Sequence, residues 1–153
     1  MRVRSSSLLT VAALAGMMSV ARADVTIEHP WVRGVVPGQS ATGAFMTIRS
    51  SEATELIRVS SPAAASASLH KMVMTDSMMS MEPVSSLPIP AHGMVDLKPG
   101  TYHVMLIGLK RTLAAGTSIP LILTFRGADR AERSLTVQAQ VTDLAAESPG
   151  SKM

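Results

Sequence analysis

Two histidine–methionine pairs in this chain have residue types and a spacing that suit a soft metal ion. His103 and Met105 stand two residues apart in the strand-like run "TYHVML", and His70 and Met72 repeat the arrangement in "LHKMVM". Residues i and i+2 of a strand project from the same face, roughly 6.5–7 Å apart. An imidazole and a thioether at that spacing can converge on one ion, so both pairs are candidate ligands.

The chemistry of these donors favours Cu(I). Thioether sulfur is neutral and soft, which makes it a poor ligand for Mg²⁺, Ca²⁺ or Zn²⁺ and a good one for Cu(I). The chain contains no cysteine, so every thiol-based mechanism is excluded, including a blue-copper electron-transfer site, which needs a Cys thiolate. Methionine cannot form a disulfide in an oxidising compartment. Histidine and methionine together therefore suit an exported carrier of Cu(I).

The segment "LHKMVMTDSMMSMEPV" (69–84) concentrates sulfur around an expected turn at Thr75-Asp76-Ser77. Its methionines are Met72, Met74, Met78, Met79 and Met81. Because methionine is flexible and apolar, a methionine-rich surface can also be a promiscuous protein-binding face. A metal-free β-sandwich that binds protein partners through this face is therefore the alternative.

Other candidate ligands have simpler explanations. Met46 alternates with Ala44 and Ile48, a pattern that predicts a core position. His29 precedes a proline and His92 lies in the turn-like run "PAHG", so both are expected to be exposed or structural.

The elements that must position these residues are strands. Apolar and polar residues alternate with period two in several short runs separated by Pro- and Gly-rich turn signals. The strands are expected at 25–31, 43–48, 54–60, 66–74, 102–109, 118–125 and 134–141. The one candidate helix outside the N-terminus is Lys110–Ala115. This spacing predicts an all-β, single-domain, antiparallel β-sandwich or barrel.

The N-terminus has the features of a secretory signal. A basic start, "MRVR", precedes the apolar run "LLTVAALAGMMSV" and the cleavage site Ala21-Arg22-Ala23. Residues 1–23 are thus expected to be a cleaved signal peptide, with a retained N-terminal membrane anchor as the alternative. Residues 24–143 would then form the copper-binding β-domain, without a membrane span, and residues 144–153 a flexible C-terminal tail.

Charge and motifs give no support to other classes of function. The signal segment holds three of the fourteen basic residues and none of the eleven acidic ones, so the remaining chain is balanced. No basic stripe with aromatic residues indicates nucleic acid. The run "GQSATG" (38–43) is one residue too long for a nucleophile elbow, and the carboxylates form no close pair. We expect no enzyme, no catalytic residue and no organic cofactor.

Spacing makes the ligand set specific. Ten residues separate His70 from Met81, twenty-one separate Met81 from His103, and one separates His103 from Met105. This H-x10-M-x21-H-x-M pattern resembles the signature of the periplasmic PCuAC-type copper chaperones. The resemblance extends to the runs "WVR" (31–33), "GAFMTI" (43–48), "LH" (69–70), "VDLKPG" (95–100) and "HVMLIGL" (103–109).

The resemblance implies a Cu(I) site formed by His70, Met81, His103 and Met105 at the exposed end of a cupredoxin-like β-barrel. It also implies location in the periplasm of a Gram-negative bacterium. Delivery would be toward the binuclear copper centre of cytochrome c oxidase subunit II or another copper acceptor, in some members beside a Sco-type thiol protein.

The chain departs from the family pattern in three places. Asp76-Ser77 replaces the usual Asp-Gly, which predicts a different turn type. Thr101-Tyr102 stands where a glycine pair often precedes the H-x-M strand. The last residues, "ESPGSKM", lack histidine, so a tail-borne Cu(II) site is not expected.

Overall fold

The computed structural model of the chain describes residues 22–143, which form ten strands. The strands are β1 (Val25–Arg33), β2 (Ala41–Ser50), β3 (Thr54–Ser60), β4 (Ala64–Thr75), β5 (Met78–Val84), β6 (Leu87–Ile89), β7 (Gly93–Leu97), β8 (Tyr102–Leu109), β9 (Ser118–Gly127) and β10 (Glu132–Thr142). The expected signal peptide at 1–23 lies outside the described residues except for its last two positions, and the expected tail at 144–153 lies wholly outside them.

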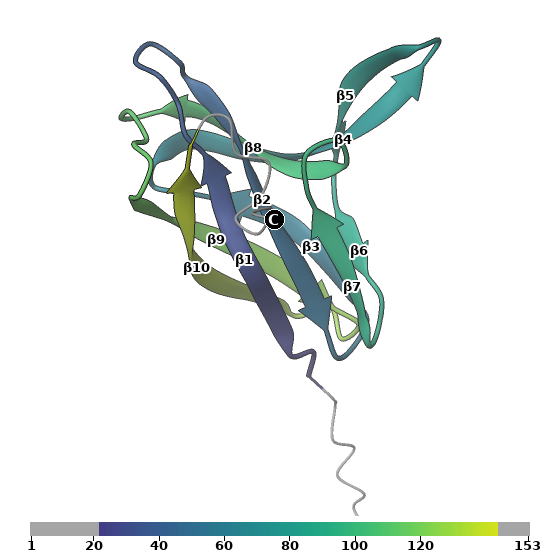
Figure 1. Ribbon diagram of the computed structural model, residues 1–153. Helices are drawn as coiled ribbons and strands as arrows, with labels where there is room; N and C mark the ends of the chain where they lie inside the picture. The colour runs from purple at the N-terminus through teal and green to yellow at the C-terminus, as the bar shows by residue number, and fades with distance from the viewer. Residues whose placement is uncertain (1–21, 144–153) are drawn as a thin grey trace, which may run out of the picture.

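All ten strands belong to one mixed sheet in the order β5-β4-β8-β7-β2-β1-β10-β9-β3-β6. The pairs β1–β10 and β7–β8 are parallel and the other pairs are antiparallel. The first half of β2 pairs with β8 and its second half with β7, so β2 joins the two parts of the sheet. Figure 1 shows the sheet curving around the body of the molecule.

The expected all-β fold is confirmed, with three corrections. The sheet is mixed rather than purely antiparallel, because β1 and β10 run side by side in the same direction. Residues Lys110–Ala115 are not helical; they lie in the loop between β8 and β9, where Leu113 is buried. Strands β5, β6 and β7 were not predicted, since β6 and β7 are short and β5 is exposed at six of its seven residues and shows no alternation.

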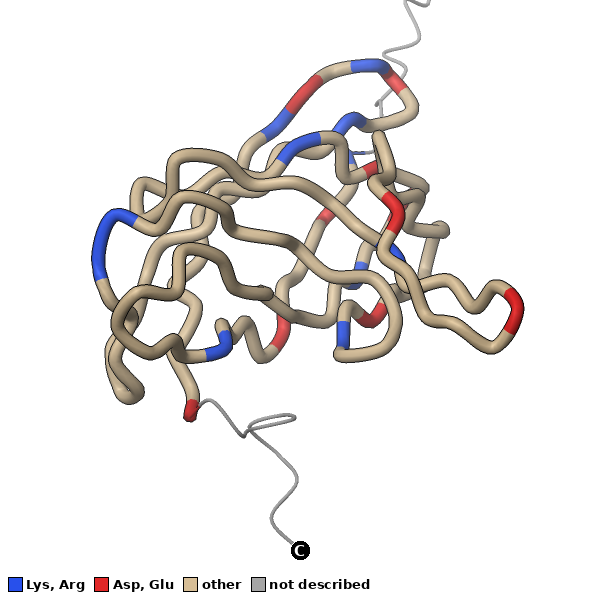
Figure 2. Tube along the Cα trace, turned by 90° about the horizontal axis from the view of Figure 1, so that it is seen from above, with Lys and Arg blue, Asp and Glu red and all other residues tan. Residues whose placement is uncertain are grey.

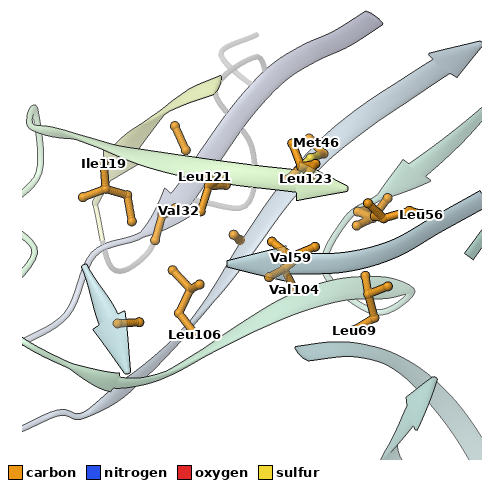
Figure 3. Close-up of a cluster of buried hydrophobic side chains, with 14 of the residues drawn as sticks. Val32, Met46, Leu56, Val59, Leu69, Val104, Leu106, Ile119, Leu121 and Leu123 are labelled. Atoms are coloured by element: carbon orange, nitrogen blue, oxygen red, sulfur yellow. The ribbon is translucent and has the colours of Figure 1, made fainter. Parts of the chain in front are cut away.

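The core lies between the two parts of the curved sheet and comes from alternate residues of most strands (Figure 3). In β8, Val104 and Leu106 point into this core, so the neighbouring His103 and Met105 project from the opposite face. Met46 is buried in the core, as predicted. Each large aliphatic side chain buried here contributes about 1.5–3 kcal/mol, which holds β8 and its outward-facing pair in a fixed register.

The hairpin of β4 and β5 projects from this body. Strand β4 pairs with β8 only as far as Lys71, whereas its pairing with β5 continues to Thr75. The end of β4 and the whole of β5 therefore form an arm at the edge of the sheet (Figure 1). Pro83 is tolerated in β5 because an edge strand has a free side.

The arm closes with a two-residue turn. Asp76 and Ser77 have φ values of 48° and 65°, and positive φ at both central residues is the type I′ pattern. Thr75 and Met78 pair across it. Asp76-Ser77 therefore forms the turn type that Asp-Gly favours, contrary to expectation, because Ser77 adopts the left-handed conformation.

The surface has no strong charge bias over the described residues. Figure 2 shows basic and acidic residues interspersed around the molecule rather than gathered on one side in that view. The ion pairs, such as Arg49–Glu28 at 2.8 Å, join exposed or partly exposed side chains. No helix within residues 22–143 has the length and hydropathy needed to cross a membrane.

Candidate metal site

One face of the β5-β4-β8 part of the sheet carries all the candidate ligands. His70 lies opposite His103 across β4 and β8, and Met72 lies opposite Met81 across β4 and β5. Residues directly opposite in an antiparallel pair share a face, as do residues two apart on one strand. Met105 therefore joins the same face two residues beyond His103. The structure brings the four predicted ligands together and adds Met72.

The two imidazoles are close neighbours in an edge-to-face arrangement. The ring centroids of His70 and His103 are 5.7 Å apart, with an interplanar angle of 70°. The Nδ1 atom of His70 is buried and has no hydrogen-bond partner. Buried polar nitrogens nearly always have a partner, and a neutral imidazole with a free nitrogen can bind a metal ion. This unpaired nitrogen fits a ligand role.

Burial favours the neutral form of the second imidazole. His103 is 7% exposed, and desolvation lowers its pKa below the ordinary value of 6.5. A hydrogen bond with the main chain of Thr101 opposes this shift, and the positive charge of a protonated His70 adds to it. Metal binding requires the neutral form of the ring, so the environment of His103 favours ligation.

A hollow of about 230 Å³ opens beside these side chains. Its lining residues are Arg33, Gly43, Phe45, Met72, Met81, Pro99, Gly100, His103 and Met105. His70 is not among them, but its ring lies next to that of His103. The main-chain N–H of Met72 donates to the carbonyl of Thr101 at 3.1 Å, which fixes the arm against the start of β8.

Two aromatic side chains pack beside the hollow. The rings of Trp31 and Phe45 lie 4.5 Å apart, and that of Phe45 lies 6.3 Å from the ring of His103. Both aromatic residues are buried but stand outside the main core cluster. The guanidinium carbon of Arg33 lies 5.7 Å from the centre of the Phe45 ring. A small second cluster thus holds His103 on the outer face of the sheet.

Met72 is not among the four predicted ligands, although it forms an H-x-M pair with His70. The structure places Met72 in the hollow, while Met74, Met78 and Met79 are exposed and do not line it. Arg33 and Phe45 were not assigned a role, and the only signal for them was their place in the runs "WVR" and "GAFMTI". His29 and His92 are exposed, as expected.

Within residues 22–143, no three His, Cys, Asp or Glu side chains gather in a group that could hold an ion. The candidate site is therefore built from two imidazoles and from thioethers, the donor set that suits a soft, monovalent ion.

The profile of the LpqE-like family, described as "Putative lipoprotein LpqE-like", matches residues 25–141, nearly all of the described chain. The chain belongs to the LpqE-like family. A curated relative is the "Putative lipoprotein Lxx21020" of Leifsonia xyli subsp. xyli (strain CTCB07), 33% identical over 102 residues. That match covers 66% of this LpqE-like chain and 61% of the relative, so the chain spans less than two thirds of the relative's length.

Solved structures share the fold of this LpqE-like protein. The copper-bound PCuAC domain from PmoF2 superposes with a TM-score of 0.62 at 23% identity, covering 78% of this chain and 92% of that domain. Apo-DR1885 from Deinococcus radiodurans gives a TM-score of 0.58 at 30% identity, covering 94% of each chain. The Cu(I) form of DR1885 gives 0.51 at 32% identity, covering 84% and 81%.

These comparisons confirm the resemblance to PCuAC proteins and the all-β fold expected from it. By their titles, the PmoF2 domain holds copper and DR1885 was also solved with Cu(I).

Proposed function

We propose that this LpqE-like protein is a Cu(I) chaperone that binds one Cu(I) through His70, Met81, His103 and Met105. The observation that carries the proposal is that these four side chains share one face of the β5-β4-β8 sheet, three of them lining a single hollow. All four donors are neutral, so the loaded site has a net charge of +1, which favours the monovalent ion. The related DR1885 structure with Cu(I) supports the same choice.

The arrangement suits transfer rather than catalysis. Thioethers are neutral ligands that exchange readily, and the Met81 side chain is 49% exposed, so a ligand from a partner can enter before the donor leaves. In this proposal the protein is not an enzyme: copper is its cargo, and its residues hold the ion and present it. The neutral His103 ring supplies a ligand at neutral pH without first releasing a proton.

The proposal also covers the compartment in which the protein acts and the protein that receives its copper. The domain at 24–143 would act after export and removal of residues 1–23, in the periplasm of a Gram-negative bacterium. The acceptor would be cytochrome c oxidase subunit II or another copper-binding protein, with a Sco-type thiol protein as a possible participant. The lipoprotein named among the relatives and the signal-like N-terminus support export.

The test is an anaerobic Cu(I) titration of the protein against a competing chelator, combined with X-ray absorption spectroscopy. We expect one tightly bound equivalent with both nitrogen and sulfur in the first shell. The pair of substitutions His103→Asn and Met105→Leu should abolish this binding, whereas His92→Asn, at an exposed histidine outside the site, should not. A stoichiometry near zero, or a shell without sulfur, would overturn the proposal.

A second candidate function rests on the exposed methionines of the arm. Met74, Met78 and Met79 present flexible apolar side chains to solvent, which suits a metal-free module that binds protein partners. Under that function, the His103→Asn and Met105→Leu variant would keep its partner binding. If the variant instead binds the partner less well than the unmodified protein does, and this difference is seen only when copper is supplied, the chaperone function is favoured.

A further inference from the structure

The ligand face of the arm continues outward beyond the proposed site. In the β4–β5 register, Met72 faces Met81, and the next residues on the same face are Met74 and Met79, which also face each other. The four methionines form two successive cross-strand pairs that lead from the hollow toward the tip of the arm. We call the Met74–Met79 pair the outer pair.

The opposite face of the arm has a different composition. It carries Lys71 opposite Glu82, Val73 opposite Ser80, and Thr75 opposite Met78. The Lys71 and Glu82 side chains form an ion pair at 3.6 Å. Apart from Met72, the arm carries four methionines. Three of them lie on the ligand face, and Met78 is the exception.

Packing within the fold does not account for the outer pair. Met74 is 66% exposed and Met79 is 52% exposed, and neither belongs to the core cluster or to the residues that pack against it. Two apolar side chains held in water face to face gain little from the fold. Their common property is a pair of soft, neutral sulfur donors on a fixed backbone register.

The geometry points to a second soft-metal site: we propose that Met74 and Met79 bind a monovalent d¹⁰ ion, Cu(I) or Ag(I), more weakly than the inner site does. Facing residues in an antiparallel pair have Cβ atoms about 4.5–5.5 Å apart, a span that two flexible thioethers can close around one ion. Soft thioether donors select such ions over Mg²⁺, Ca²⁺ and Zn²⁺.

The outer pair would serve as a station for ligand exchange. Successive pairs on one face are about 6.5–7 Å apart, so an ion can pass from the outer to the inner pair by exchanging one thioether for another. Copper remains Cu(I) throughout, and no proton or electron is transferred. This role rests on the proposed function, whereas binding at the outer pair does not.

The experiment uses Ag(I), which is stable in air, and the protein labelled with ¹³C at the methionine methyl groups. Titration followed by NMR reports each thioether separately. We expect the first equivalent to shift the methyl groups of Met81 and Met105, and the second to shift those of Met74 and Met79. The variant Met74→Leu with Met79→Leu should lose the second event and keep the first.

Met78→Leu is the matched control, because Met78 is the most exposed methionine of the arm, at 72%, but lies on the opposite face. It should keep both binding events. Leucine conserves volume at these exposed positions, and the amide spectrum of each variant verifies that it is folded. Absence of shifts at Met74 and Met79, or equal shifts at Met78, would overturn the inference.

The two proposals fail in different ways. If the outer pair binds Ag(I) while the methyl groups of Met81 and Met105 do not respond, the chaperone site is wrong and the outer site stands. If only the inner residues respond, the chaperone proposal stands and the outer site is wrong.

Discussion

His70 and His103 face each other across β4 and β8, with their ring centroids 5.7 Å apart and their planes at 70°. The Nδ1 atom of His70 is buried and has no hydrogen-bond partner, and burial lowers the pKa of His103 below its ordinary value. Thirty-two residues of sequence separate them, and the antiparallel register brings them together. This pair anchors the candidate site, and the sulfur donors lie on either side of it.

The cross-strand pair of Met72 and Met81 predicts that the two methionines act together. Because Met72 lines the same hollow, its sulfur can replace a missing Met81 sulfur. We expect Met81→Leu alone to weaken Cu(I) binding less than the double variant with Met72→Leu, with a coupling energy of about 0.5–3 kcal/mol. Competition titrations of the four proteins in the cycle measure this energy. Additive losses would contradict the replacement of one sulfur by the other.

The matched control for that cycle is Met94→Leu. Met94 lies in β7 and is also exposed, so its removal deletes a solvent-facing thioether away from the hollow. Cu(I) affinity should not change.

The lowered pKa of His103 predicts a pH-dependent stability of the metal-free protein. Between the folded pKa and 6.5, the unfolded chain binds more protons at this ring than the folded one. The contribution of His103 to the stability of the fold is therefore complete above pH 6.5. It is lost as the pH falls through the pKa that this ring has in the folded protein. Urea unfolding from about pH 7.5 to about pH 5 should show a steeper loss of stability in the native protein than in His103→Gln.

NMR titration of the metal-free protein measures the same property at one atom. The imidazole signals of His103 should reach their midpoint below 6.5. A midpoint at or above 6.5 would contradict the buried, neutral state of this ring.

The turn of the arm predicts that Ser77→Gly stabilises the hairpin. Ser77 has a φ of 65°, a conformation that costs an L-residue about 1–2 kcal/mol and glycine almost nothing. The greater freedom of glycine in the unfolded chain offsets part of the gain, so the net effect should be about 0.5 kcal/mol. Slower amide exchange in β5 is the expected result. Ser80→Gly, within the strand, should speed exchange instead.

Gly43 leaves the space that the ring of Phe45 occupies. A Cβ atom at position 43 would lie 2.9 Å from Cζ of that ring. The centroid of the Phe45 ring lies 6.3 Å from that of His103. We expect Gly43→Ala to displace the ring, to cost about 1–3 kcal/mol of stability and to weaken Cu(I) binding. Urea unfolding and competition titration measure the two effects.

The variant Phe45→Leu tests the cause. If the ring is the obstacle, Gly43→Ala should cost much less in the Phe45→Leu background. An equal cost in both backgrounds would mean that the added methyl group acts through the backbone of β2.

The amino-acid sequence alone was enough to predict the candidate donors, their spacing along the chain and the strands β4 and β8, which carry His70, His103 and Met105. Alternation in β4 and β8 identified His70, His103 and Met105 as strand residues with partners two positions away, and the absence of cysteine excluded thiolate chemistry. The turn at Asp76-Ser77 was also predictable, because Thr, Asp and Ser are turn-forming residue types. Each of these features is local, because residues near one another in the chain encode it.

Tertiary structure decided which of these residues meet. Period two states which residues of one strand share a face, but register between strands follows from the core and the turn geometry. Burial of Val104 and Leu69 on the inner face fixes His103 opposite His70. The type I′ turn fixes Met72 opposite Met81 and directs Met78 away from the ligand face. Strand β5 has no buried face of its own, so only pairing with β4 could reveal it.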